Sequence, residues 1–203
     1  MARKALSQRQ IQSQVLKQKI RDAAKSLVCQ KGYEGVTIDE ICAEVGVTKG
    51  TFYNYFDSKE QIILDDIAAD NLHYRNKLRP KVSKMQPGLS KLIALLQLAI
   101  AYENSRDREL TRLFYRVRTI DPKKMPSVYP DKRELYKIIE ELINEAQSCG
   151  EVRRDLSSSQ LATIVLYSVR GIVFSWSLPT TNFNLTEMGE NLFAVLQEGL
   201  RKR

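Results

Sequence analysis

The sequence has little of what enzyme active sites are built from. Its 203 residues include one histidine, His73, and three cysteines, Cys29, Cys42 and Cys149. His73 lies in a polar helical stretch with no cysteine or carboxylate cluster beside it. The chain also has no glycine-rich phosphate loop, no metal-ligand quartet and no nucleophile elbow. We therefore predict that the protein is not an enzyme and requires no metal and no cofactor.

The sequence also shows no sign of export or of a membrane span. Its first residues lack an apolar signal core. The longest apolar run, Leu161 to Leu178, contains Arg170 and several small polar residues, so it predicts a buried helix rather than a transmembrane one. The cysteines are odd in number, and Cys29 and Cys42 lie among apolar residues, as free thiols in a reducing compartment do. We expect a cytoplasmic protein with no membrane partner.

Positive charge is abundant and unevenly distributed. The net charge is +8 and the pI about 9.4, a balance that favours a polyanionic partner. Residues 1–31 carry eight Lys and Arg against one acid, Asp22. The alternative to phosphate contact is a basic helix that is merely solvated. Contact is favoured because this segment adjoins the motif described below.

Hydrophobic periodicity is helical almost throughout, and no segment alternates as a strand does. We predict an all-α fold of about nine helices. The first helix ends at Gly32, and Thr37 with Glu40 forms a capping box that opens the second. Further helices are expected from Thr48, from Asp57 or Ser58 to about Leu78 with Pro80 as its stop, and over 89–103, 106–118, 131–149, 157–177 and from Asn184.

The spacing of Thr37, Gly46 and Thr48 predicts a helix-turn-helix motif at about residues 37–56. Gly46 permits the turn, and Phe52 and Phe56, at i and i+4, anchor a helix too short to be stable alone. Its other side chains are left to face a DNA groove. A helical hairpin with a polar surface is the alternative. The residues left to face the groove or its rims are Thr48, Lys49, Gly50, Thr51, Tyr53, Asn54 and Tyr55. Among them, Asn54 suits adenine and Lys49 suits guanine or a phosphate.

Residues 20–64 resemble the N-terminal domain of the TetR family of bacterial transcriptional regulators. The resemblance is carried by Gly32-Tyr33-Glu34-Gly35-Val36-Thr37, Val45-Gly46-Val47, Lys49-Gly50-Thr51-Phe52-Tyr53 and Ser58-Lys59-Glu60. It implies a homodimer that binds a near-palindromic double-stranded DNA operator and is released by a small-molecule effector. It also implies base-facing positions for Lys49, Gly50, Thr51 and Asn54, and backbone-facing positions for Thr37, Thr48, Tyr53, Tyr55 and Lys59. Many members have His where this chain has Tyr55, so that contact would lose any positive charge.

The resemblance is weak after about residue 70, where it implies a layout only. We expect a DNA-binding domain at 1–57, a connecting helix at 58–80 and an effector-binding and dimerisation domain at 81–203. The last two helices carry too many apolar residues for one buried stripe, so part of them should meet a partner subunit. Candidate interface residues are Ile164, Ile172, Phe193 and Leu196. Candidate effector-pocket residues are Tyr102, Phe114, Arg116, Tyr136, Tyr167 and Trp176.

Two alternatives to a ligand-responsive repressor stay open at this point. An activator of the same fold would have the same sequence features. A helical interaction protein that has lost operator binding would keep the fold but act through a protein partner. The intact basic and polar face of the short helix argues against this second alternative.

Overall fold

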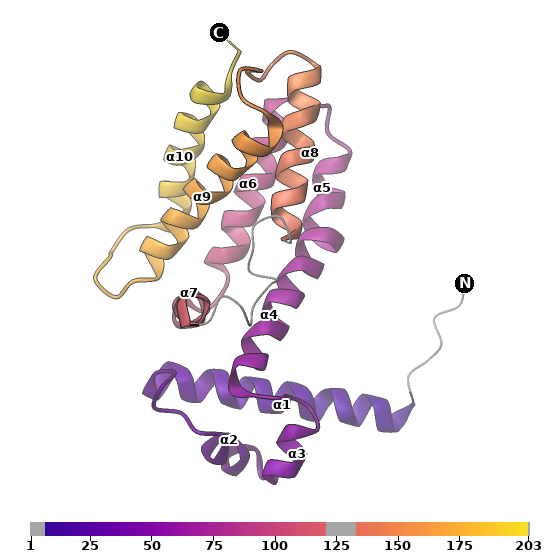
Figure 1. Ribbon diagram of the computed structural model, residues 1–203, viewed down its shortest axis with the longest axis vertical. Helices are drawn as coiled ribbons and strands as arrows, with labels where there is room; N and C mark the ends of the chain where they lie inside the picture. Colours follow the sequence, from indigo (N-terminus) through magenta and orange to yellow (C-terminus); the bar gives the residue numbers. More distant parts are fainter. Residues whose placement is uncertain (1–6, 121–132, 203) are drawn as a thin grey trace. The chain divides into compact units, whose positions relative to one another are not determined.

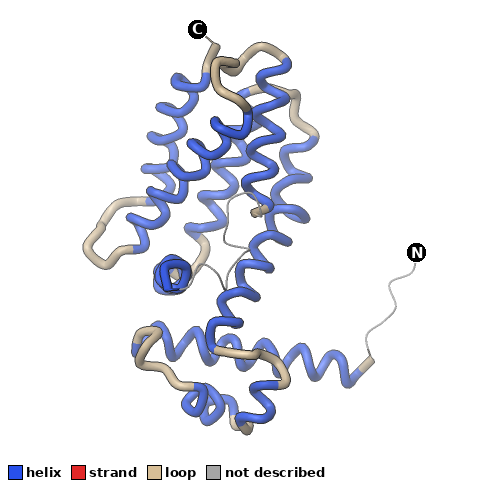
Figure 2. The backbone as a smooth tube through the Cα atoms, viewed as in Figure 1, coloured by secondary structure: helices blue, strands red, loops and turns tan. Residues whose placement is uncertain are grey.

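The computed structural model describes residues 7–120 and 133–202, without the side chains of residues 63, 64, 66, 67 and 116–120. Throughout this part the regular structure is helical (Figure 2), apart from one isolated β-bridge between Val152 and Arg201. The all-α prediction is confirmed. The described residues form ten α-helices and one π-helical turn, against the nine or so helices expected.

The chain divides into two compact units, Met1–Asp65 and Asp66–Arg203. The boundary lies inside α4 (Lys59–His73), which therefore contributes residues to both units (Figure 1). It falls within the segment 58–80 that the sequence predicts as a connecting helix. Each unit has its own apolar core.

Unit 1 contains α1 (Gln8–Lys31), α2 (Ile38–Val45) and α3 (Lys49–Tyr53). The predicted capping box is present, because the Thr37 side chain accepts from the Glu40 amide and the Glu40 carboxylate accepts from the Thr37 amide. Apolar residues from all three helices and from the start of α4 form the core of the unit. Its buried members are Ile20, Ala24, Leu27, Val36, Ile41, Cys42, Phe52, Phe56 and Ile62.

The turn between α2 and α3 depends on Gly46. This residue has φ 73° and ψ 38°, in the left-handed region that residues with a side chain rarely adopt. Its amide and that of Val47 donate to carbonyl oxygens in the last turn of α2, which ends the helix. α3 can then begin at Lys49, three residues after Gly46, in a new direction.

The prediction that Pro80 stops the connecting helix is wrong. α4 continues through a π-helical turn, η1 (Tyr74–Leu78), into α5 (Arg79–Ser83), and Pro80 lies in the first turn of α5. The wider π-helical turn places the Arg79 amide on the carbonyl of Tyr74, five residues back. A proline in the following turn, where it has no amide to donate, is tolerated at such a junction.

Unit 2 is a bundle of long helices that follows α5 (Figure 1). α6 packs against α10 and α8, and α9 packs against α7, α8 and α10. Their buried faces form one apolar core, to which Tyr74 and Leu78 of η1 also belong. The predicted start of a helix at residue 131 lies outside the described residues. The bounds are α6 (Leu89–Asn104), α7 (Arg108–Ile120), α8 (Glu134–Ser148), α9 (Ser158–Ser177) and α10 (Leu185–Leu200).

Candidate functional site

The two phenylalanines that the sequence predicts as anchors are both buried, but only Phe52 lies on α3, and Phe56 follows three residues after the end of the helix. Phe52 and Phe56 are 0% and 1% exposed, and their ring centroids lie 5.8 Å apart. Thr48 caps the helix by accepting a hydrogen bond from the Thr51 amide at 3.1 Å. A helix of five residues is thus fixed by tertiary packing and one cap rather than by its own propensity.

The opposite face of α3 is polar and turned to solvent. Lys49, Gly50 and Asn54 are exposed, and Thr51 is partly exposed. The ring of Tyr53 is half exposed beside them, so amine, hydroxyl and amide groups share one surface. Such groups are the ones that read base edges in a major groove.

Lys49 has an acidic neighbour across the turn. Its Nζ lies 2.9 Å from Oδ1 of Asp39 in the first turn of α2. The hydrogen bond to Asp39 and the charge of that carboxylate raise the pKa of Lys49, which is cationic in any case. The carboxylate therefore competes with any anion for the same ammonium group.

Three predicted backbone-facing hydroxyl groups already make hydrogen bonds within unit 1. The Thr37 hydroxyl donates to the Glu40 carboxylate at 3.0 Å, and the Tyr55 hydroxyl accepts from Ser13 at 3.3 Å. A hydrogen bond from Lys31, followed by the bonds from Thr37, lowers the pKa of Glu40 to about 2. Thr48 pairs its hydroxyl with that of Thr51 at 3.0 Å.

Lys59 is placed differently from the other predicted backbone-facing residues. Its Nζ donates to the carbonyl oxygens of Tyr33 at 2.7 Å and Val36 at 2.8 Å, and it lies 4.1 Å from the centroid of the Tyr33 ring. The sequence assigned this ammonium group to phosphate. In the structure it fixes the loop that leads into α2, so its contribution to unit 1 is structural.

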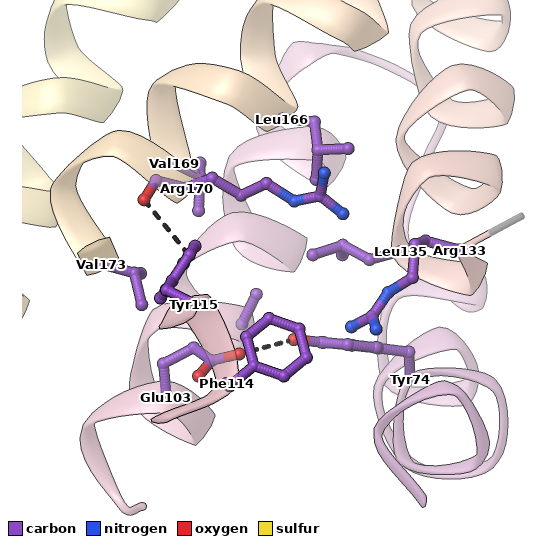
Figure 3. Close-up of a pocket in the computed structure, with 11 residues that line it drawn as sticks. Tyr74, Glu103, Phe114, Tyr115, Arg133, Leu135, Leu166, Val169, Arg170 and Val173 are labelled. Atoms are coloured by element: carbon purple, nitrogen blue, oxygen red, sulfur yellow. Dashed lines mark hydrogen bonds between the residues drawn. The ribbon is translucent and has the colours of Figure 1, made fainter. Parts of the chain in front are cut away.

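Unit 2 contains a small cavity of about 40 Å³ between α6, α7, α8, α9 and η1. Figure 3 shows the guanidinium groups of Arg133 and Arg170, the Glu103 carboxyl group and several aliphatic side chains around it. The volume holds about three water molecules. The lining residues are Tyr74, Ala99, Glu103, Phe114, Tyr115, Arg133, Leu135, Leu166, Val169, Arg170 and Val173.

Beside this cavity lies a buried ionic network centred on Asp70, which is 3% exposed. Arg106 Nη1 approaches both Asp70 oxygens, at 3.0 and 2.9 Å, and the Tyr102 hydroxyl donates to Oδ1 at 2.9 Å. The Tyr74 hydroxyl donates to Glu103 at 3.0 Å. Burial raises the pKa of Glu103, an effect that the nearby Arg106 opposes.

Of the predicted effector-pocket residues that the structure describes, Phe114 lines the cavity. Tyr102 instead belongs to the Asp70 network and stacks on His73, and Tyr136 is bonded to Ser159. Trp176 is packed under the Arg108 guanidinium. Tyr167 is 54% exposed and points out of unit 2, which contradicts a pocket role. The Arg116 side chain lies outside the described residues.

The sequence interpretation missed Arg133, Glu103 and Arg170 as cavity residues. All three are charged residues, which the sequence interpretation did not place in a buried lining. Their inward orientation depends on the packing of helices far apart in the sequence, so no local pattern marks them.

The predicted interface residues on α9 and α10 are not equally accessible. Ile164 is exposed, and Ile172 and Leu196 are partly buried. Phe193 is 3% exposed in the core of unit 2, so the chain itself buries it and leaves nothing for a partner. Other apolar side chains on these two helices are exposed: Tyr167, Phe174, Met188 and Val195.

The described part of the chain contains no helix long and apolar enough to cross a membrane. In the same part, no three His, Cys, Asp or Glu side chains come together as metal ligands would.

Two family models match the chain and together cover more than half of it. Residues 20–65 match the bacterial regulatory proteins of the tetR family, and residues 132–199 match the C-terminal region of YsiA-like proteins. A curated relative, the HTH-type transcriptional repressor DhaR of Mycobacterium sp. (strain GP1), is 25% identical over 196 residues, which cover 89% of this chain and 92% of that protein.

Solved structures show the same fold. Thermus thermophilus FadR, a TetR-family repressor in complex with lauroyl-CoA, superposes with a TM-score of 0.69 at 23% identity, covering 92% of this chain and 96% of that one. Bacillus subtilis FadR, in complex with stearoyl-CoA, gives a TM-score of 0.77 at 18% identity, covering 91% and 99%.

The helix-turn-helix unit and the helical body thus define a DNA-binding transcriptional regulator. The chain belongs to the TetR family. Its matches are consistent with a ligand-responsive repressor.

Proposed function

We propose that the chain represses transcription by binding a near-palindromic operator as a homodimer, with α3 of each subunit in a major groove. The observation that carries this proposal is the division of α3 into a buried face and a polar one. Phe52 and Phe56 fix the helix, and Lys49, Thr51 and Asn54 are presented together on its exposed side. A short polar helix fixed in this way is suited to reading base edges.

The roles within this surface follow from chemistry and exposure. Asn54 offers an amide that pairs with adenine, and Thr51 offers a hydroxyl or a methyl group. Thr37, Thr48, Tyr53 and Tyr55 lie at the rims, where hydroxyl groups contact phosphates. The basic surface of α1 adds attraction that is independent of base sequence.

The dimer is proposed to form through α9 and α10. Ile164, Tyr167 and Phe174 lie along one exposed face of α9, and Val195 of α10 is more exposed still. Apolar side chains of this size gathered on two adjoining helices indicate a protein interface rather than a solvated surface. Ile164, Ile172 and Leu196 are retained from the sequence as interface candidates.

The effector is proposed to enter the cavity of unit 2. Tyr74 lines this cavity and lies in η1, directly after α4. α4 itself supplies residues to both units. A ligand that prefers one arrangement of Tyr74 and its neighbours would therefore bias the helix that continues into the DNA-reading unit. The proposed hinges are the segment near Asp57, just before α4, and the junction at Arg79–Pro80, where η1 passes into α5.

Selection of binding sites from a random double-stranded DNA library tests operator recognition. We expect a near-palindromic consensus and a discrete complex that resists excess non-specific DNA. Thr51→Ala and Asn54→Ala should each cost about 1–3 kcal/mol at one or two positions of the consensus. Asn144→Ala, the same substitution on the exposed face of α8, is the matched control.

Two outcomes separate the alternatives. Binding by the Thr51 and Asn54 variants that equals the parent's on every operator variant would overturn the assignment of base readers. If selection yields no consensus and binding is only salt-sensitive, the chain is not an operator-specific regulator. A reporter gene placed downstream of the selected site then distinguishes repression from activation.

A further inference from the structure

Arg133 is a buried cation with unused hydrogen-bond donors. Its side chain is 8% exposed, and it stands immediately before α8. Neither Nε nor Nη1 has a hydrogen-bond partner, a situation shared among buried groups of the described residues only by Nε of Arg21. A guanidinium group has donors only and cannot be neutralised at accessible pH, so these N–H groups need an acceptor.

The nearby acids do not supply that acceptor. Asp70 Oδ2 lies 3.8 Å from Arg133 Nη2, beyond hydrogen-bond distance, because Arg106 and Tyr102 already occupy its oxygens. Glu134, the next residue, turns the other way and pairs with Arg75 at 2.9 Å. The ring of Phe114, at 5.6 Å from the guanidinium carbon, gives a cation–π contact but no strong acceptor.

The unused donors face the cavity. Figure 3 shows the Arg133 guanidinium pointing into it, with the Arg170 guanidinium directed toward the same space from α9. Leu135, Leu166 and Val169 supply an aliphatic wall. The site therefore combines a cationic end with an apolar side, which is the complement of an amphipathic anion.

The electrostatics of the cavity favour a single negative charge. Glu103 lines the same space, and its carboxyl group opposes a dianion more strongly than a monoanion. Burial raises the pKa of Glu103, which reduces this repulsion when its proton is retained. The volume of about 40 Å³ is of the order of a carboxylate group, so a larger ligand must widen the cavity as it enters.

We propose that the effector is a free monocarboxylate with an apolar body, whose carboxylate oxygens accept hydrogen bonds from Arg133. This inference rests on the proposed ligand-responsive function and names the chemical class of its ligand. It assigns to Arg133 the role of ligand-binding residue. Widening of the cavity on binding would displace Tyr74, which links the ligand to η1.

Calorimetric titration of the purified full chain, without DNA, tests the proposal. The probes are octanoate and benzoate, each paired with its uncharged amide, together with octyl phosphate and octanoyl-CoA. We expect one of the carboxylates to bind at least about tenfold more tightly than its amide. The carboxylate offers two negatively charged acceptor oxygens to Arg133, and the amide offers one neutral acceptor oxygen. Octyl phosphate and octanoyl-CoA should bind more weakly than that carboxylate.

Variants place the binding at Arg133. Arg133→Met removes the charge at similar length and should weaken carboxylate binding at least about tenfold. Arg133→Lys keeps the charge but not the planar guanidinium group, so its affinity for the carboxylate should lie between those of the parent and Arg133→Met. Arg112→Met is the matched control, because Arg112 lies on α7 outside the cavity lining and pairs with Glu109. Circular dichroism checks that each variant is folded, and removal of an unsatisfied buried cation should leave Arg133→Met at least as stable as the parent.

Several results would overturn the proposal. Equal binding of acid and amide, preference for octyl phosphate or octanoyl-CoA, full carboxylate affinity in Arg133→Met, or no binding of any probe would each do so. Operator binding measured by mobility shift on the same preparations is independent of these results. Its loss in the parent chain would contradict the proposed function instead.

Discussion

Lys49 and Asp39 form an ion pair, 2.9 Å between Nζ and Oδ1, that joins α3 to the first turn of α2. Both side chains are more than half exposed, so solvent screens the pair and it adds little to the stability of unit 1. The pair matters instead for DNA binding. The pair holds the cation of the proposed reading surface against an acid, and DNA must replace or accommodate that acid.

Asp39→Asn should therefore tighten DNA binding. The substitution releases the Lys49 ammonium and removes one negative charge from the proposed DNA-binding surface. We expect dissociation constants about threefold lower on specific and random DNA alike, measured by fluorescence anisotropy at fixed salt. Glu44→Gln is the matched control, because it makes the same charge change at an exposed position on the same helix. Equal effects of the two variants would show that the ion pair itself restrains nothing.

Gly50→Ala separates folding from DNA contact. A Cβ at this position would meet only the Thr48 hydroxyl, at an ordinary 3.7 Å, so nothing inside the described part of the chain requires glycine there. We expect the free energy of unfolding to rise by up to about 1 kcal/mol, because alanine is less flexible than glycine in the unfolded chain. Affinity for the selected operator should fall at least about tenfold if the DNA backbone or a base edge approaches this face. Unchanged affinity would place Gly50 away from the groove.

Lys59→Met tests the structural role of this lysine. The variant keeps the aliphatic stem but loses the ammonium that bonds the Tyr33 and Val36 carbonyls. We expect the free energy of unfolding to fall by about 1–3 kcal/mol, since hydrogen bonds to a charged group are lost. Urea denaturation followed by circular dichroism measures it, with Lys19→Met on exposed α1 as the control. A Lys59 that acts on phosphate alone would change the salt dependence of DNA binding and leave the stability intact.

His73 should make the stability of unit 2 depend on pH. Burial lowers the pKa of His73, which stacks on Tyr102 with centroids 3.8 Å apart. Between the lowered folded pKa and the unfolded value near 6.5, the unfolded chain binds more protons, so the free energy of unfolding rises with pH. The stability that the protein gains from keeping His73 neutral is fully present above about pH 7 and is lost as the pH falls toward the pKa of His73 in the folded state.

His73→Gln should flatten this dependence. Because the chain has no other histidine, the difference between parent and variant from pH 5 to 7 isolates the group from carboxyl groups common to both. We expect a difference of less than about 1 kcal/mol, from chemical denaturation at each pH. A parent that loses no more stability than the variant on acidification would refute the assignment.

Local features of unit 1 were predictable because their causes lie within a few residues. The capping box of Thr37 and Glu40, the turn at Gly46 and the anchoring by Phe52 and Phe56 each depend on short-range spacing. Lys59 was assigned to DNA because nothing in its neighbourhood reveals that its acceptors are backbone carbonyls 23 and 26 residues earlier.

The cavity of unit 2 was only partly predictable. Aromatic residues at helical spacing suggested a lining, yet Tyr102 and Trp176 are used in other contacts and Tyr167 faces outward. Arg133 carries no sequence signal, because the lack of hydrogen-bond partners for its Nε and Nη1 atoms depends on tertiary packing rather than on neighbouring residues.

The π-helical turn at Tyr74–Leu78 fixes the register between the two α-helical segments that it joins. One residue of an α-helix corresponds to about 100° of rotation about its axis. The extra residue in this turn therefore sets the angular phase between the side chains of α4 and those of α5. Should the turn change to α-helical hydrogen bonding, α4 and α5 would rotate relative to each other about the helix axis. A ligand that touches Tyr74 would then be read out as torsion along the helix, and not only as a change in its tilt.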